Sequence, residues 1–160
     1  MTVNHARRGF SLRLARGLAW LATLSSTTNR AADDASTGPD PFPELARAIT
    51  GGAPIRTGRV HIDTPRLADN GHSVPITVNV DSAMTQIDYV RRITLVSENN
   101  PRPLIATFHL SAKSGRAEIT TRIRLNRTQC VMALAELSDG TFWSSRAEVI
   151  VTESACLDAD

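Results

Sequence analysis

Residues 117–125 read AEITTRIRL and residues 130–137 read CVMALAEL. In the first stretch, apolar residues and one Thr at odd positions alternate with charged or polar residues, which is typical of a strand with one solvated face. The second stretch is apolar at nearly every position and predicts a central strand that is covered on both faces. Ser138-Asp139-Gly140 follows as a hairpin turn. The two stretches and this turn therefore predict an antiparallel sheet.

The same pattern extends toward the N-terminus. Turn-forming sequences separate short apolar runs at a spacing of roughly 8–14 residues, which is typical of an all-β sandwich of about seven strands. No alternation of strands and helices suggests a parallel sheet. The other predicted strands are Val60–Ile62, Val74–Val80, Tyr89–Val96, Leu104–Leu110 and Thr141–Val151, and the turns are Asp69-Asn70-Gly71, Asn99-Asn100-Pro101 and Lys113-Ser114-Gly115. In the first of these turns, Asn-Gly would supply a positive φ at little cost.

A short helix precedes the predicted strands. Residues 44–50, ELARAIT, place Leu45, Ala48 and Ile49 on one face. Gly51-Gly52 should end the helix as a C-cap. The predicted sandwich domain, with its N-terminal helix, therefore spans residues 44–152.

The N-terminus has the composition of an export signal. Residues 1–32 hold five arginines and no acidic residue, and they include Arg7-Arg8 followed by Phe10. An apolar stretch and then a polar, small-residue segment follow, and the apolar stretch is shorter than the roughly 20 residues that span a bilayer. This order predicts a cleaved twin-arginine signal and a periplasmic protein. The alternative is a disordered basic tail on a cytosolic protein. Residues 33–43, rich in Asp, Ser, Gly and Pro, predict a linker.

Removal of this signal changes the charge of the protein. Without its five arginines, the remaining chain has 13 basic and 16 acidic residues, a net charge of −3. A mildly acidic protein binds nucleic acid and anionic membranes poorly. We therefore expect neither nucleic acid nor, in the mature form, a membrane as a partner.

The sequence offers no catalytic or cofactor motif. It contains no phosphate-binding loop, dinucleotide fingerprint, Gly-x-Ser-x-Gly or Cys-x-x-Cys. Its histidines, His5, His61, His72 and His109, show no metal-ligand spacing. We expect no cofactor and no metal, and no catalytic constellation supports an enzyme.

Several ordered stretches resemble the SoxY family of thiosulfate-oxidation proteins. Residues 65–76, PRLADNGHSVPI, are similar to the family's P-x-hydrophobic-A-D/E-N-G-x-x-V-P segment, and residues 100–106, NPRPLIA, are similar to its N-P-x-P turn. Residues 115–125 contain its T-R-I-R-L strand, and residues 138–140 and 149–152 also match. The resemblance covers roughly residues 40–156, which is the whole presumed mature domain.

This resemblance implies a fold, a partner and a site. The fold would be an immunoglobulin-like antiparallel β-sandwich, paired with a SoxZ-like protein as a heterodimer. The protein would carry sulfur intermediates between periplasmic thiosulfate-oxidising enzymes and would catalyse nothing itself. The covalent attachment residue would be Cys156, in a C-terminal tail of residues 153–160.

The tail departs from the family pattern, in which glycines flank the cysteine. Here Ser154-Ala155 precede Cys156 and Leu157 follows it. Glycine, which has no Cβ, would make the tail more flexible and narrower. The nearby carboxylates of Glu153, Asp158 and Asp160 disfavour a thiolate at Cys156 and repel anionic thiosulfate. Three interpretations stay open: a diverged carrier, a SoxY-like binding or scaffold module without carrier chemistry, and a small periplasmic enzyme.

The second cysteine, Cys130, lies inside an apolar run and is expected to pack as a small hydrophobic residue. The hairpin should place residues near 149 opposite Cys130. Cys156 would then lie up to about 23 Å further along an extended tail, whereas a disulfide requires Cα atoms within roughly 7 Å. A Cys130–Cys156 disulfide would therefore require the tail to fold back.

The basic residues Arg91-Arg92, Arg122, Arg124 and Arg127 fit either a solvated strand face or a docking site for a partner. A partner sandwich would also need an apolar contact. Residues 130–137 and 149–151 are the candidates for that contact.

Overall fold

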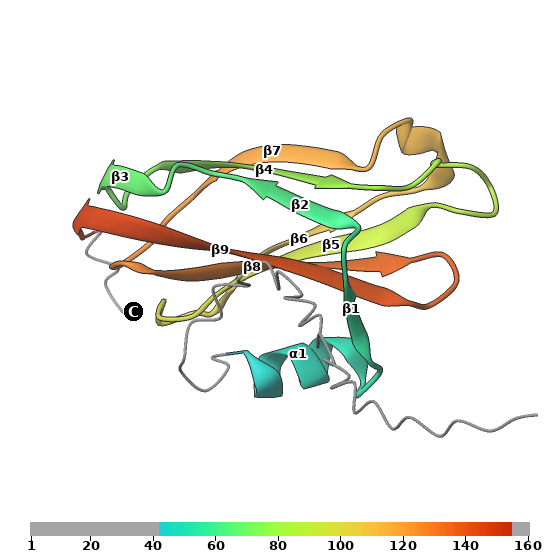
Figure 1. Ribbon diagram of the computed structural model, residues 1–160, viewed down its shortest axis with the longest axis horizontal. Coiled ribbons are helices and arrows are strands. Elements are labelled where there is room, and N and C mark those ends of the chain that lie inside the picture. Colours follow the sequence, from blue (N-terminus) through green and yellow to red (C-terminus); the bar gives the residue numbers. More distant parts are fainter. Residues whose placement is uncertain (1–41, 155–160) are drawn as a thin grey trace, which may run out of the picture. The chain divides into compact units, whose positions relative to one another are not determined.

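The computed structural model describes residues 42–154, and within them two β-sheets pack face to face (Figure 1). The described residues form nine strands, one α-helix and one 3₁₀ turn at Ala112–Ser114. The first sheet has the order β1-β9-β8-β5-β6 with β3 also paired to β9, and the second has the order β2-β4-β7. The bounds are α1 Pro43–Thr50, β1 Ile55–Thr57, β2 Val60–Asp63, β3 Leu67–Asn70, β4 Val74–Val80, β5 Val90–Ser97, β6 Leu104–His109, β7 Glu118–Ile123, β8 Gln129–Leu137 and β9 Phe142–Glu153. The all-β, immunoglobulin-like sandwich is confirmed.

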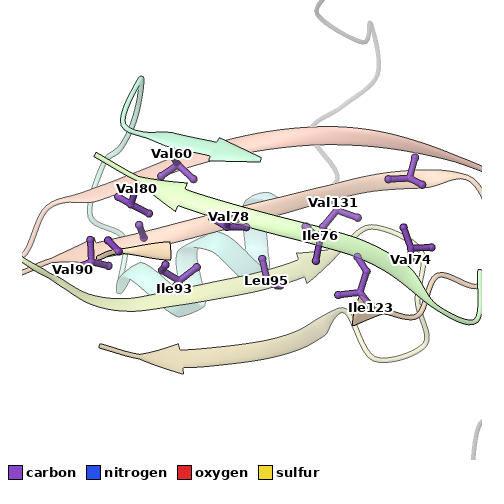
Figure 2. Packing of buried hydrophobic residues seen from close by; sticks show 14 of the residues in the cluster. Val60, Val74, Ile76, Val78, Val80, Val90, Ile93, Leu95, Ile123 and Val131 are labelled. Carbon is purple, nitrogen blue, oxygen red and sulfur yellow. The ribbon is translucent and has the colours of Figure 1, made fainter. Parts of the chain in front are cut away.

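The core forms where the alternating strands of the two sheets face each other. Strand β4 buries Val74, Ile76, Val78 and Val80, each at most 3 % exposed. Figure 2 shows these side chains pointing toward residues of β5 and β8, among them Ile93, Leu95 and Val131. Full burial of one such aliphatic side chain stabilises the fold by about 1.5–3 kcal/mol. The predicted alternation of β4 is confirmed, and that of β7 is confirmed by the burial of Ile123 beside exposed Glu118 and Arg122.

Strand β8 is covered on both faces, as its sequence predicts. Val131, Ala133 and Ala135 belong to the core between the sheets. Met132 faces the other way and packs with α1 in a second cluster that also contains Phe42. This arrangement explains why nearly every residue of β8 is apolar.

Helix α1 differs from its prediction in one respect. It ends at Gly51, whose φ of 65° is left-handed, as expected for a C-cap. Ala48 is exposed, however, and the buried positions are Ala46 and Thr50. Leu45 and Ile49 do pack against the cluster that contains Phe42 and Met132, so the predicted face is confirmed at these two positions and wrong at Ala48.

The sequence also missed β1 and β3, two short strands that pair in parallel with β9. Asp69 and Asn70, expected in a turn, lie at the end of β3, and neither Asn70 nor Gly71 has a positive φ. The turn instead covers residues 71–73, where the Asn70 side chain accepts a hydrogen bond of 3.2 Å from the His72 N–H. Pairing with the end of β9 thus overrides the local turn preference.

We predict that Phe42→Ala lowers the free energy of unfolding by about 3 kcal/mol, because it removes a large buried side chain and leaves a cavity over Met132. Urea denaturation, monitored by circular dichroism, measures this difference in the free energy of unfolding. The control is Ile87→Ala, at a side chain that is 89 % exposed, which should change the stability by less than about 0.5 kcal/mol. Equal effects of the two substitutions would contradict this account of how α1 docks.

Candidate functional site

The predicted attachment residue, Cys156, lies outside the described residues, which end at Ser154. The structure does describe the strand from which the tail leaves the sandwich. We call residues Ile150–Glu153, the last four residues of β9, the tail root. Because Cys156 follows Glu153 by only three residues, the position of the tail root limits the region that Cys156 can reach.

On one edge the tail root pairs with β3. Ile150 lies opposite Leu67 and Val151 opposite Ala68 in parallel register. The Ile150 N–H donates to the Arg66 carbonyl at 2.8 Å, and the Gly71 N–H donates to the Glu153 carbonyl at 2.8 Å. This edge therefore holds the backbone of the tail root as far as Glu153.

Two threonine hydroxyls add to this pairing from opposite edges. The Thr152 hydroxyl donates to the Asp69 carbonyl on β3 at 2.6 Å. On the β8 side, backbone pairing ends at Gln129 and Val149. There the Thr128 hydroxyl accepts from the Val151 N–H at 2.9 Å and lies 3.4 Å from the Val151 carbonyl. The Thr128 side chain thus takes the place of the next backbone partner on β8.

A buried amide fixes the segment that presents Thr128. Gln129 is 3 % exposed. Its side-chain oxygen accepts from the Asn99 N–H at 2.8 Å, and its NH₂ group donates to Asn100 at 2.9 Å and Asn126 at 3.0 Å. The Asn126 side chain in turn donates to the Asn99 carbonyl at 2.7 Å. This network ties the loop after β5 to the segment before β8, so that Thr128 is held in place.

Cys130 lies on the outer side of β8, half-buried beside the apolar residues of α1. This position agrees with its predicted role as a small packing residue. Its register partner on β9 is Glu148, one residue from the predicted position 149. Its N–H donates to the Glu98 carboxylate at 3.0 Å.

The basic residues singled out in the sequence have different partners in the structure. Arg91 donates to the Ser138 carbonyl at 2.7 Å, whereas Arg92 forms an ion pair of 2.6 Å with Glu136 in which both side chains are less than one-third exposed. Arg122 contacts Ser73. Exposed Arg124 and Arg127 lie between β7 and β8.

The apolar contact expected along residues 130–137 is not available, because the core and α1 cover β8. Val149 and Val151 are also buried. Two exposed apolar side chains lie at the start of the tail root: Ile150, which is 38 % exposed, and its register partner Leu67 on β3, which is 57 % exposed. They are the better candidates for a contact with a partner.

The hairpin between β8 and β9 contains a carboxyl group with a clearly shifted pKa. The backbone N–H and the hydroxyl of Thr141 both donate to the Asp139 carboxylate, at 2.9 and 2.7 Å, and lower the pKa of Asp139 below its usual value. A lowered pKa in the folded state means that the ionised group stabilises the fold above its unfolded pKa and that this contribution is lost as the pH falls through the folded pKa. The shift belongs to the turn rather than to a reactive site.

The described part of the chain holds neither a group of metal-ligand residues nor a membrane-spanning helix. Residues 42–154 contain no group of three or more His, Cys, Asp and Glu that could hold a metal ion. His61 pairs with Asp81 at 2.9 Å on the surface. None of the described helices is long and apolar enough to cross a membrane.

A family model described as sulfur oxidation protein SoxY matches residues 46–156, well over half of the chain. This chain belongs to the SoxY family. The match takes in α1, both sheets and the tail root, and it extends to the position of Cys156. Two of the stretches that resemble the family contribute to these contacts: residues 65–76 supply β3, which pairs with the tail root, and residues 100–106 begin with Asn100 of the Gln129 network.

One solved structure agrees with this assignment, and others share only the fold. The sulfur carrier protein SoxY from Chlorobium limicola f thiosulfatophilum is 25 % identical, with a TM-score of 0.57 over 68 % of this chain and 89 % of that one. Superoxide reductases share the fold alone: that of Ignicoccus hospitalis is 16 % identical, with a TM-score of 0.55 over 61 % of this chain and 94 % of that one. That of Nanoarchaeum equitans is 14 % identical, with a TM-score of 0.51 over 60 % and 100 %. No curated protein matches the chain.

The sequence alone did not point to Thr128 or Gln129. Their partners are far away in the chain, at Val151 and Asn99–Asn100, and only the fold brings them together. The available signal was weak: a Gln at the start of an otherwise apolar strand, where burial demands a hydrogen-bonded partner.

We predict that Gln129→Leu destabilises the protein by about 1–3 kcal/mol, because the Asn99 N–H and the Asn100 side chain lose a buried partner. Thr120→Val, which removes an exposed hydroxyl pair with Thr77 on the other sheet, should cost much less. Chemical denaturation of both variants measures the difference. A loss no larger in Gln129→Leu than in Thr120→Val would contradict the structural role of the network.

Proposed function

We propose that this SoxY-family protein is a periplasmic carrier that holds sulfur intermediates covalently on Cys156 during thiosulfate oxidation, as partner of a SoxZ-like subunit. The observation that carries the proposal is the anchored tail root, with Cys156 only three residues beyond Glu153. The similarity to a sulfur carrier protein supports it. Export by a twin-arginine signal in residues 1–32, which lie outside the described residues, belongs to the same proposal.

The chemistry at Cys156 would be the formation of a sulfur–sulfur bond. The Cys156 thiol loses its proton, and its sulfur joins the terminal sulfur of the thiosulfate dianion as Cys–S–S–SO₃⁻, while two electrons leave for a coupling cytochrome in the periplasm. A thiolate is the reactive form. The sandwich itself supplies position, and the enzymes of the pathway would supply the redox and hydrolytic steps.

The short tail limits how an enzyme can reach the cargo. Three residues extend at most about 10 Å from Glu153. An enzyme that encloses Cys156 must therefore approach the end of the sandwich, where Leu67 and Ile150 are exposed. We infer that this apolar pair contacts the enzymes that load and unload the carrier.

A second function fits the altered tail. Ser154, Ala155 and Leu157 stand where a carrier of this family has glycines, and bulkier residues restrict entry into a narrow channel. In that case the fold and the pairing with a SoxZ-like subunit would persist in a scaffold without cargo.

Intact mass spectrometry of the mature protein, purified from the periplasm after exposure to thiosulfate, tests the proposal. We expect an adduct of sulfane or sulfonate mass that a reductant removes. The adduct should persist in Cys130→Ser and disappear in Cys156→Ser. A bare thiol in wild-type protein and in both variants would favour the scaffold.

The acidic tail generates a separate prediction. Asp158→Gly combined with Asp160→Gly should speed alkylation of Cys156 by iodoacetamide about two- to tenfold at neutral pH, because less negative charge opposes the thiolate. The difference should shrink in 1 M salt, where screening acts within about 3 Å. An unchanged rate at low salt would count against this electrostatic effect.

A further inference from the structure

We propose that the open edge of β6 is the docking surface for the SoxZ-like subunit, which adds a strand with acidic flanks to the larger sheet. The identity of the partner rests on the proposed function, whereas the features of the edge belong to this chain. β6 is the last strand of its sheet, and no other strand within residues 42–154 pairs with its outer side. Such an edge leaves backbone N–H and C=O groups unpaired.

The hydrogen bonding to β5 shows which backbone groups of β6 face outward. The Leu110 N–H donates to the Arg91 carbonyl at 2.9 Å. This pair continues the register in which His109 lies opposite Arg92. In an antiparallel pair, hydrogen-bonded and non-hydrogen-bonded positions alternate. The N–H and C=O groups of Thr107 and His109 therefore point away from β5, toward the open edge.

β6 lacks the charges that protect many edge strands from pairing. Natural edges are often very short, carry charged residues or are interrupted by bulges. β6 reads LIATFH and has no Lys, Arg, Asp or Glu over six residues. A register shift between Leu95 and Val96 of β5 interrupts the pairing near the start of β6, before Thr107. The other edge strands that the structure describes all contain a charge: Arg56 in β1, Asp63 in β2, Asp69 in β3, and Glu118 and Arg122 in β7.

The core beside β6 is incompletely covered. Phe108 and Leu110 pack against the core but are only partly buried. Ile93, which lies opposite Phe108 on β5, is 0 % exposed. Leu104, at the start of β6, is 50 % exposed. A strand added to β6 would cover part of this apolar surface, so that docking would gain hydrophobic burial in addition to backbone hydrogen bonds.

The charges around β6 indicate the chemistry of the partner. Residues 99–117, which contain β6 and its flanking loops, hold Arg102, Lys113 and Arg116 and no acidic residue. All three side chains are exposed, and within residues 42–154 none of them forms an ion pair. Opposite charges on paired strands stabilise the pairing, and like charges oppose it. A strand with acidic flanks therefore fits this edge, whereas a second copy of this chain would bring basic flanks together.

The position of β6 in the sheet is compatible with the carrier function. Strands β5 and β8 lie between β6 and β9, which ends in the tail root. A subunit on β6 would therefore occupy the opposite edge of the sheet from the tail root. Leu67 and Ile150, the contact proposed above for the enzymes, lie beside β9 and not beside β6.

Binding of the full mature chain to the SoxZ-like subunit, measured by isothermal titration calorimetry, tests the proposal. The first variant is Thr107→Pro, which removes an outward N–H and no hydrogen bond to β5. The matched control is Thr120→Pro on β7. There the Val80 N–H donates to the Ala117 carbonyl at 2.9 Å, so the alternation directs the Thr120 N–H outward as well.

A charge variant keeps the test decisive if Thr107→Pro does not fold. Lys113→Glu combined with Arg116→Glu reverses two charges beside β6 without changing the strand itself. Arg124→Glu combined with Arg127→Glu makes the same change in net charge at the exposed loop between β7 and β8 and serves as its control. Amide hydrogen exchange of the free and the bound chain, measured by NMR, reports the pairing directly.

We expect Thr107→Pro to raise the Kd about tenfold or more, as expected for the loss of one or two hydrogen bonds, while Thr120→Pro binds like wild type. The Lys113→Glu, Arg116→Glu variant should bind several-fold more weakly than its control, and the difference should shrink in 1 M salt. In the complex, exchange should slow at Thr107 and His109 and stay unchanged at Thr120.

Wild-type binding with unchanged exchange at Thr107 and His109, or with equal Kd values for the two Pro variants, would overturn the docking surface and leave the pairing with a SoxZ-like subunit standing. Self-association that protects the same two amides would overturn the proposal by assigning the edge to a second copy. A wild-type chain that does not bind the subunit would refute the pairing and this occupant of β6 together. Failure of sulfur loading in a complex formed through β6 would refute only the carrier function.

Discussion

The structure depends most on the pairing of β9 along both of its edges. This strand runs from Phe142 to Glu153, pairs with β8 on one side, and receives β1 and β3 on the other. Each pairing satisfies backbone groups that would otherwise lie unpaired at a sheet edge. Because β9 also leads directly into the tail, the forces that complete the sheet also fix the point where the tail begins.

The outer faces of the two sheets differ in polarity. The outer face of the β2-β4-β7 sheet is polar, with hydroxyl and amide pairs such as Thr77–Thr120 and Asn79–Glu118. The outer face of the larger sheet is covered by α1 over Met132. The end that holds the tail root combines the Gln129 network with exposed Leu67.

Much of the fold could be predicted from the sequence, because the patterns that specify most of its elements are local. Alternation located β4 and β7, continuous apolar character located β8, and the glycine after α1 marked the end of that helix. The parallel strands β1 and β3 could not be predicted, since three or four residues carry no usable period and their pairing is set by β9. The same holds for the site. The family resemblance indicated Cys156, whereas Thr128 and Gln129 could not be predicted because they hydrogen-bond to partners more than 20 residues away.

Residue-specific amide hydrogen exchange along β9, measured by NMR on the mature protein, tests the central claim most directly. The account predicts slow exchange at Ile150 and Val151, whose N–H groups donate to Arg66 and Thr128, at a level close to that of Val149 in the core. Exchange at Ile150 and Val151 as fast as in an exposed loop would contradict this account, because the ordered part of β9 would then end at Val149 and the tail root would not be held by its hydrogen bonds.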